Sequence, residues 1–140
     1  RANPEGIVAR RINLSQIGSY SQEKFEQLLR VVVFETDSRL KQESPVDTGR
    51  FRASWAISEQ GTPGYDAGPQ ASDAAIRPPR KLDYQVERAG GVYHIHNNLP
   101  YAEKLAGGSS TQAPAGWTER IAREMTAYAQ QQAKRIGRQD

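Results

Sequence analysis

The sequence predicts an α+β fold in which a small antiparallel sheet packs against two long amphipathic helices. Apolar residues recur with helical spacing near both ends of the chain, over residues 21–43 and 117–136. Between these segments, 14 of the 20 Gly and Pro residues (eight Gly and six Pro) fall from Gly61 to Gly116, which indicates an irregular middle with short strands. No regular alternation of strand and helix patterns is present, which argues against a parallel sheet.

The composition is typical of one soluble domain of 140 residues, with an N-terminal arm over residues 1–20. The chain has no Cys, which excludes disulfides, thiol nucleophiles and Cys-based metal sites. It shows no membrane-spanning apolar run and no secretory leader, so we expect a cytoplasm-like compartment. The net charge of +3 comes from Lys and Arg near both ends, and solubility explains it better than nucleic-acid binding does.

The first long helix is predicted over residues 21–43. Ser19 or Ser21 can cap its first free N–H groups, and Pro45 favours an extended Ser44, which ends the helix. Its roughly 21 residues span about 31 Å. The main apolar stripe consists of Phe25, Leu28, Leu29, Val32, Thr36 and Leu40.

The same helix carries a second apolar surface. Val31, Val33 and Phe34 lie outside the main stripe. A helix that is apolar on more than one face has to be covered on more than one side. We therefore expect a sheet on one side and a neighbouring subunit on the other.

A tight turn is predicted to follow this helix. Asp47 and Thr48 after Pro45 can accept hydrogen bonds from the following backbone N–H groups, and Gly49 can adopt a positive φ. Apolar and polar residues then alternate over residues 51–58, which predicts a strand with one buried face. The buried positions of this strand would be Phe51, Ala53, Trp55 and Ile57.

The middle of the chain is predicted to be largely irregular. Residues 59–83 form a long Gly/Pro-rich loop, which either is disordered or orders against something else. A hairpin over residues 84–95 would turn at 89–91. A short helix over 100–106 would end at Gly107 in a left-handed conformation.

The last long helix is predicted over residues 117–136, after a Ser/Thr/Gly/Pro loop. Three alanines on it allow a neighbouring element to approach closely: Ala122, Ala129 and Ala133. Its apolar stripe consists of Trp117, Ile121, Met125, Tyr128, Gln132 and Ile136.

The sequence contains no convincing catalytic constellation. His94 and His96 share one face of a predicted strand, but no third ligand at a suitable position accompanies them, so no metal is expected. Residues 107–110 lack the Lys of a phosphate-binding loop, and no strained turn presents a nucleophilic Ser. Carboxylate pairs such as Asp83 and Glu87 are ordinary on surfaces. The sequence therefore predicts no enzyme and no cofactor.

Two strings are more specific than composition. SPVDTGRFRASW at residues 44–55 resembles the P-x-D-T-G-x-L-R-x-S signature of phage tail-completion or neck proteins, the family named after gene product ten of a lambdoid phage. NNLPYAEKLAGGSSTQAPAG at residues 97–116 is similar to that family's N-x-x-P-Y-A-x-x-L-E-x-G-x-S-x-Q-A-P-x-G block. The chain departs from the family at Ala106, where Glu is usual, and at Trp117, where Met is common. With the two flanking helices, the resemblance covers nearly the whole chain.

The resemblance implies a non-enzymatic virion protein at the head–tail junction of a long-tailed phage, assembled in the host cytoplasm. Many copies would form a ring, a hexamer by alignment with the tail tube or otherwise a dodecamer. The ring would lie between the portal-side adaptor or stopper proteins and the tail terminator, and genomic DNA would pass through its lumen. No membrane and no small-molecule substrate are implied.

Several residues of the two strings are candidates for contacts in such a ring. Arg50 and Arg52 would project from one face of the strand start and could meet an acidic patch on a neighbour. Tyr101 and Trp117 are bulky and amphipathic, and we expect them to anchor the short and long helices to the sheet. The candidate contacts with a neighbouring subunit or ring are Arg50, Arg52, Tyr101, Gln112 and Pro114.

Two other functions remain open at this point. A nucleic-acid-binding module could use the basic termini together with the aromatic side chains of Tyr84, Tyr93 and Trp55. A small metal-dependent hydrolase could be built on His94 and His96.

Overall fold

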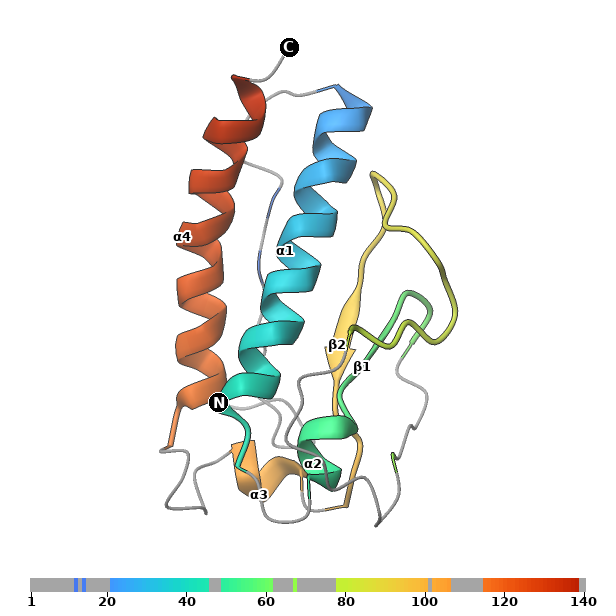
Figure 1. The fold of residues 1–140 in the computed structure, drawn as a ribbon, viewed down its shortest axis with the longest axis vertical. Helices are drawn as coiled ribbons and strands as arrows, with labels where there is room; N and C mark the ends of the chain where they lie inside the picture. The colour runs from blue at the N-terminus through green and yellow to red at the C-terminus, as the bar shows by residue number, and fades with distance from the viewer. Residues whose placement is uncertain are drawn as a thin grey trace.

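The computed structural model describes residues 12, 14, 21–45, 49–61, 67, 78–100, 102–106 and 115–138. Along the chain these residues form α1 (Gln22–Glu43), α2 (Arg50–Ala53), β1 (Ala56–Ser58), β2 (His94–His96), α3 (Ala102–Ala106) and α4 (Trp117–Gly137). The expected α+β class is confirmed (Figure 1). Within the described ranges, no helix has both the length and the apolar character needed to cross a bilayer.

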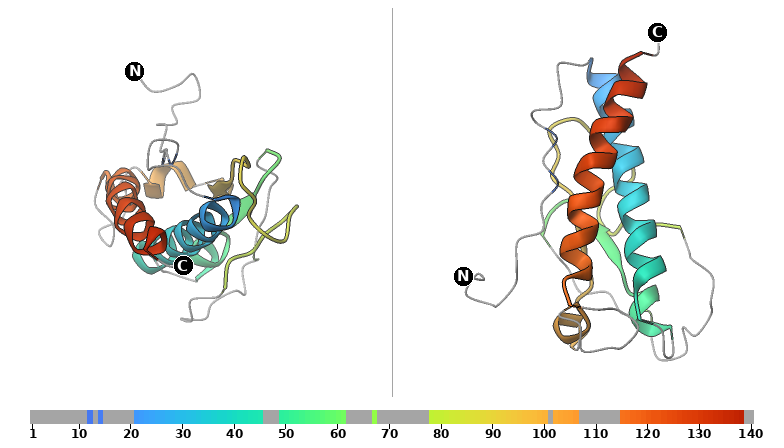
Figure 2. Two further views of the ribbon diagram at one scale, coloured as in Figure 1. Left: turned by 90° about the horizontal axis from the view of Figure 1, so that it is seen from above. Right: turned by 90° about the vertical axis from the view of Figure 1, so that its left-hand side faces the viewer.

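α1 and α4 lie side by side and run in opposite directions (Figure 1, Figure 2). Both helices match the predicted segments closely. At the start of α1, Ser21 Oγ accepts a hydrogen bond from Lys24 N at 3.3 Å. At its end, Ser44 is extended with ψ 137°, as expected for a residue before proline. Local capping signals therefore determine both ends of α1.

The hydrophobic core lies mainly between α1 and α4. Ala129 and Ala133 of α4 are buried, as the prediction of a close approach requires. Ile12 and Leu14, which belong to the predicted N-terminal arm, also pack against this core. The buried cluster consists of Leu28, Val32, Leu40, Phe51, Trp55, Leu99, Trp117, Ile121, Met125, Ala129, Ala133 and Ile136.

The sheet is short and lies beside α1, on the side away from α4 (Figure 2). β1 and β2 pair antiparallel, with Ile57 opposite Ile95. On its other edge, β1 is bridged by Lys81: Ile57 N donates to Arg80 O, and Leu82 N donates to Ile57 O, both at 2.9 Å. Ile57 is completely buried between these neighbours.

The predicted strand over 51–58 is wrong in its first half, because residues 50–53 form α2. Gly49 has φ 84° and its carbonyl accepts a hydrogen bond from Ala53 N at 2.9 Å, which starts a helical turn. Phe51 and Trp55 are both buried, and their ring centroids are 5.7 Å apart. A spacing of four residues fits a helical turn as well as an alternating strand, so these two positions could not separate the two structures.

The predicted hairpin over 84–95 is also wrong. β2 pairs with β1 rather than with residues 84–86, so its partner lies far away in the sequence. The turn itself is where it was expected, since Gly90 has φ 89° and Gly91 N donates to Arg88 O at 3.0 Å. The rings of Tyr84 and Tyr93 contact each other across this turn, at 4.8 Å between centroids.

Other predictions concern segments that are described only in part. Of the Gly/Pro-rich loop over 59–83, residues 62–66 and 68–77 lie outside the described residues, whereas residues 78–83 pack along β1. The short helix is present as α3, two residues shorter than predicted at its start. Its predicted cap, Gly107, lies outside the described residues.

Candidate functional site

The structure describes only part of the predicted turn and contact set. Pro45 is buried, and Gly49 adopts the positive φ expected of it. The remaining predicted site residues lie outside the described residues: Asp47, Thr48, Tyr101, Gln112 and Pro114.

Arg50 and Arg52 do not share a strand face, because both belong to α2. Residues two apart in a helix point in nearly opposite directions. Arg52 Nε donates to Lys41 O at 2.9 Å, so this side chain satisfies a carbonyl in the last turn of α1. The expectation of a paired arginine face is therefore wrong, and Arg52 connects α2 to α1.

The two sequence strings meet in the structure. Asn97 at the start of the second string donates from Nδ2 to the carbonyl of Phe51 in the first, at 2.8 Å. Within the first string, Trp55 Nε1 donates to Ser44 Oγ at 2.8 Å. α2 and α3 accordingly lie at the same end of the molecule (Figure 1). We call this contact the string junction and define it by Ser44, Phe51, Trp55 and Asn97.

Trp117 extends the packing at this end of the molecule. Its side chain is 1% exposed, and Nε1 donates to Leu105 O of α3 at 2.8 Å. The indole N–H of Trp117 therefore connects α4 to α3, and the expected packing of its ring on the sheet stays a prediction. Buried indole N–H groups need such a partner, and here a carbonyl near the end of α3 supplies it.

The histidine pair lies in the short sheet, in β2. His94 and His96 lie in β2 opposite Ser58 and Ala56. No group of three or more His, Cys, Asp or Glu side chains that could hold a metal ion occurs among the described residues. Of the aromatic residues considered for nucleic-acid stacking, Trp55 is buried, and the rings of Tyr84 and Tyr93 contact each other.

We expect His96 to make the stability of the protein depend on pH. Both of its ring nitrogens are buried and have no hydrogen-bond partner among the described residues. Burial, and after it the charge of His94, lowers the pKa of His96. The unfolded chain thus binds a proton on the His96 ring more tightly than the folded chain does. The free energy of unfolding therefore decreases as the pH falls below about 6.5. Thermal melts from about pH 8 to pH 5.5 should show this loss, and His96→Phe should reduce it.

The control for this experiment is His94→Gln, which should keep most of the loss because His94 is exposed. A His96→Phe variant whose melting temperature depends on pH as steeply as that of the unmodified chain would contradict the prediction.

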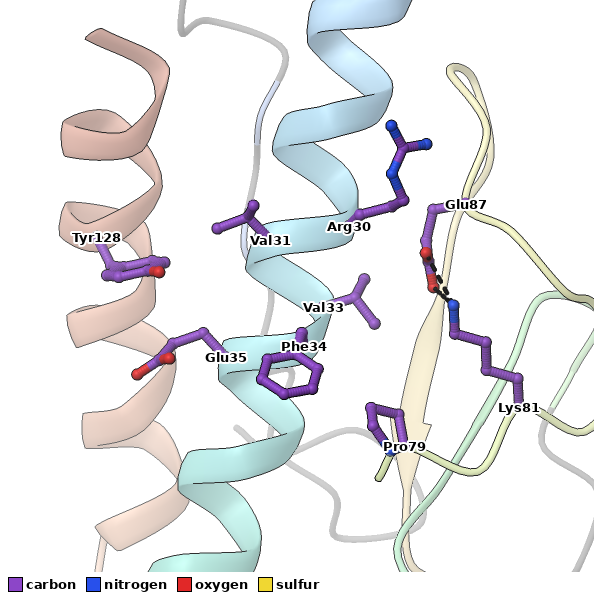
Figure 3. Close-up of a pocket in the computed structure, with 9 residues that line it drawn as sticks. All are labelled: Arg30, Val31, Val33, Phe34, Glu35, Pro79, Lys81, Glu87 and Tyr128. Atoms are coloured by element: carbon purple, nitrogen blue, oxygen red, sulfur yellow. Dashed lines mark hydrogen bonds and ion pairs between the residues drawn. The ribbon is translucent and has the colours of Figure 1, made fainter. Parts of the chain in front are cut away.

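A groove lies on the outer side of α1 (Figure 3). Its volume is about 350 Å³. The floor comes from α1 residues 30, 31 and 33–35, one wall from Tyr128 of α4, and the other from Pro79, Lys81 and Glu87. Phe34 is 58% exposed in it. We call this feature the Phe34 groove.

The wall opposite Tyr128 is held by a polar network around the buried Glu87. Lys81 Nζ lies 3.0 Å from Oε1 and 2.9 Å from Oε2 of Glu87, and Tyr84 Oη donates to Glu87 Oε2 at 2.5 Å. Burial, followed by the bond to Glu87, raises the pKa of Tyr84 well above its usual range, so the phenol stays a donor. Glu87 is 1% exposed and needs both partners.

A second buried pair attaches the same segment to α1. Lys41 Nζ lies 2.8 Å from Asp37 Oδ2 and donates to the carbonyl of Pro78 at 3.3 Å. Both side chains are almost completely buried. Burial raises the pKa of Asp37 even though Lys41 opposes this effect. Asp37 and Lys41 of α1 thus help to hold residues 78–87 in place.

The charged groups around the Phe34 groove differ in whether they are already paired. Glu35 forms an ion pair with Arg39 at 2.8 Å, and Arg39 lies over the Tyr128 ring at 5.3 Å. Arg30 is exposed and forms no hydrogen bond or ion pair with a described residue. The groove therefore offers an aromatic ring and one cation, an arrangement suited to binding an apolar side chain beside an acidic group.

The apolar floor of this groove corresponds to the second apolar surface predicted on the first helix. Its far wall was missed, because no pattern in residues 78–87 indicates that this segment returns to α1. The buried Asp37–Lys41 pair was missed as well, although Asp37 and Lys41 are four residues apart on a helix, a spacing typical of ion pairs.

Comparison with protein-family models, with curated proteins and with solved structures finds no match to this chain.

Proposed function

We propose that this protein is a structural subunit of a tailed phage, a tail-completion or neck protein that forms a ring at the head–tail junction. In this role it acts through shape and contact rather than catalysis. Copies of the chain close a ring between the portal-side proteins and the tail terminator, and DNA passes through the ring. The proposal extends the resemblance of the two sequence strings to the phage family.

The observation that supports the proposal best is the hydrogen bond from Asn97 Nδ2 to Phe51 O. The resemblance consists of two strings separated by about forty residues, and chance similarity gives no reason for them to touch. Here they meet at one end of the fold, where Trp55 and Leu99 are buried in the same cluster. Two strings that build one structural unit are expected if they are a joint signature of a fold.

The proposal is tested in phage particles from which the gene has been deleted. We expect filled heads and tails that fail to join, with joining restored by the unmodified chain, and side-chain-resolution images should place the chain at the junction. Intact particles without it, or restored particles that lack it at the head–tail junction, would overturn the proposal.

A matched pair of variants connects the string junction to this function. Asn97→Asp removes the Nδ2 donor with little change of size, and we expect lower stability by about 1–3 kcal/mol together with poorer restoration of joining. Gln130→Glu makes the same chemical change on the exposed face of α4 and should restore joining fully.

A further inference from the structure

The Phe34 groove leaves two groups without partners in the described part of the chain. Phe34 is 58% exposed, although it lies between walls that bury its neighbour Val33. Arg30, one turn earlier on α1, has no described acidic partner. The other charges around the groove, Lys81 and Glu87 among them, neutralise one another. A complementary surface would present an apolar side chain and a carboxylate close together.

The chain itself carries such a surface at its 86–92 turn. Apart from Phe34, the only large apolar side chains exposed among the described residues are Val86 (51%) and Val92 (66%). Glu59 lies beside this turn, since a Cβ placed on Gly91 would stand 2.9 Å from Glu59 Oε2. The Glu59 carboxylate forms no ion pair with a described cation. We call the 86–92 turn together with Glu59 the turn knob.

The turn knob is held firmly, as a binding element should be. Arg88 N donates to Tyr93 Oη at 2.7 Å, and the Tyr93 ring packs on Tyr84. Ala89 N donates to Glu26 Oε2 of α1 at 3.2 Å. These bonds fix the turn before any partner arrives, so that binding costs little additional ordering.

We propose that the turn knob of one copy binds the Phe34 groove of the next. Val92 covers the exposed Phe34 ring, and Glu59 faces Arg30. The apolar side chains give the contact its affinity, while the pairing of Glu59 with Arg30 sets its orientation. The occupant of the groove is thus a second copy of this chain.

The contact has a consequence for symmetry. The groove and the turn knob adjoin at Glu87 and otherwise consist of different residues. A contact made in one direction only is head-to-tail, and repetition closes a ring when the rotation between copies allows it. In this respect the inference rests on the proposed function, which requires a ring. A two-fold contact, either groove against groove or with each turn knob in the partner's groove, would give only dimers, also from a variant that carries a cysteine on both surfaces.

Cysteine cross-linking tests the contact cleanly, because the chain has no cysteine of its own. Val31→Cys places a thiol in the groove and leaves Phe34 in place, and Val92→Cys places one on the turn knob. With a short bismaleimide, we expect a covalent dimer when the two single variants are mixed and none from either alone. The variant carrying both cysteines should give a ladder of multimers.

Gln130→Cys replaces Val31→Cys in the control, because Gln130 is exposed on α4 outside the groove; its mixture with Val92→Cys should remain uncross-linked. Dimers from Val31→Cys alone, as abundant as those from the mixture, would show a two-fold contact and overturn the proposal. So would a mixture that fails to cross-link both at high concentration of the purified chain and in assembled particles.

Charge exchange provides a second test that keeps Phe34 in place. Arg30→Glu in the Val31→Cys chain should lower the cross-linked yield about five- to tenfold, and pairing it with Glu59→Arg in the Val92→Cys chain should restore it. If the yield falls and is not restored, Arg30 and Glu59 do not face each other, and the contact is wrong.

The outcomes separate this contact from the proposed function. Particles that carry the chain at the head–tail junction without the Val31–Val92 cross-link would refute the contact alone. The cross-link in purified protein, together with particles that join without the chain, would refute the function alone.

Discussion

Replacing Trp117 by alanine is expected to destabilise the protein by about 3–5 kcal/mol, the cost typical of removing a fully buried indole. The side chain is 1% exposed at the start of α4 and belongs to the core cluster with Ile121 and Leu99. Its loss also leaves the carbonyl of Leu105 without its indole donor. Urea denaturation monitored by circular dichroism measures the change in the free energy of unfolding.

Two further variants identify the source of this effect. Trp117→Phe keeps an aromatic ring but lacks the N–H donor, and we expect an intermediate loss. Phe34→Ala removes an exposed ring and should change the stability of the isolated chain by less than about 1 kcal/mol. If Trp117→Ala costs no more than Phe34→Ala, Trp117 does not connect α4 to α3.

Replacing Lys41 by methionine is expected to destabilise the protein by about 3–5 kcal/mol, because it leaves the buried Asp37 carboxylate without its cation. The carbonyl of Pro78 loses a donor at the same time. Unfolding free energies at neutral pH measure the effect. The double variant Asp37→Leu with Lys41→Met removes both charges and should recover most of the loss, since burying a matched apolar pair avoids desolvation.

The loss in Lys41→Met should shrink on acidification. Burial raises the pKa of Asp37, so the folded state binds this proton more tightly than the unfolded chain does. The stability penalty of the charged form is therefore relieved as the pH falls through the raised pKa of Asp37 toward about 3.8. A double variant no more stable than Lys41→Met, or a penalty that grows at low pH, would contradict a buried and uncompensated carboxylate at position 37.

The string junction and the Phe34 groove differ in how much of each could be predicted from the sequence. The two strings can be recognised in the sequence, but their contact through Asn97 and Phe51 O depends on where α2 and α3 lie. The apolar floor of the groove was predicted as a second apolar surface of the first helix, formed by Val31, Val33 and Phe34. The wall at Pro79, Lys81 and Glu87 could not be predicted, because that segment is held by side-chain hydrogen bonds that only the folded structure reveals.

The sequence by itself determined α1 and α4. Helical hydrogen bonds join residues four apart, and caps such as Ser21 act within one turn, so the pattern that predicts these helices is local. Tertiary structure alone decided that Phe51 lies in a helical turn, that His94–His96 pairs with Ala56–Ser58, and that Asp37 and Lys41 are buried. These outcomes depend on partners distant along the chain, whose contacts leave no periodic trace in the sequence.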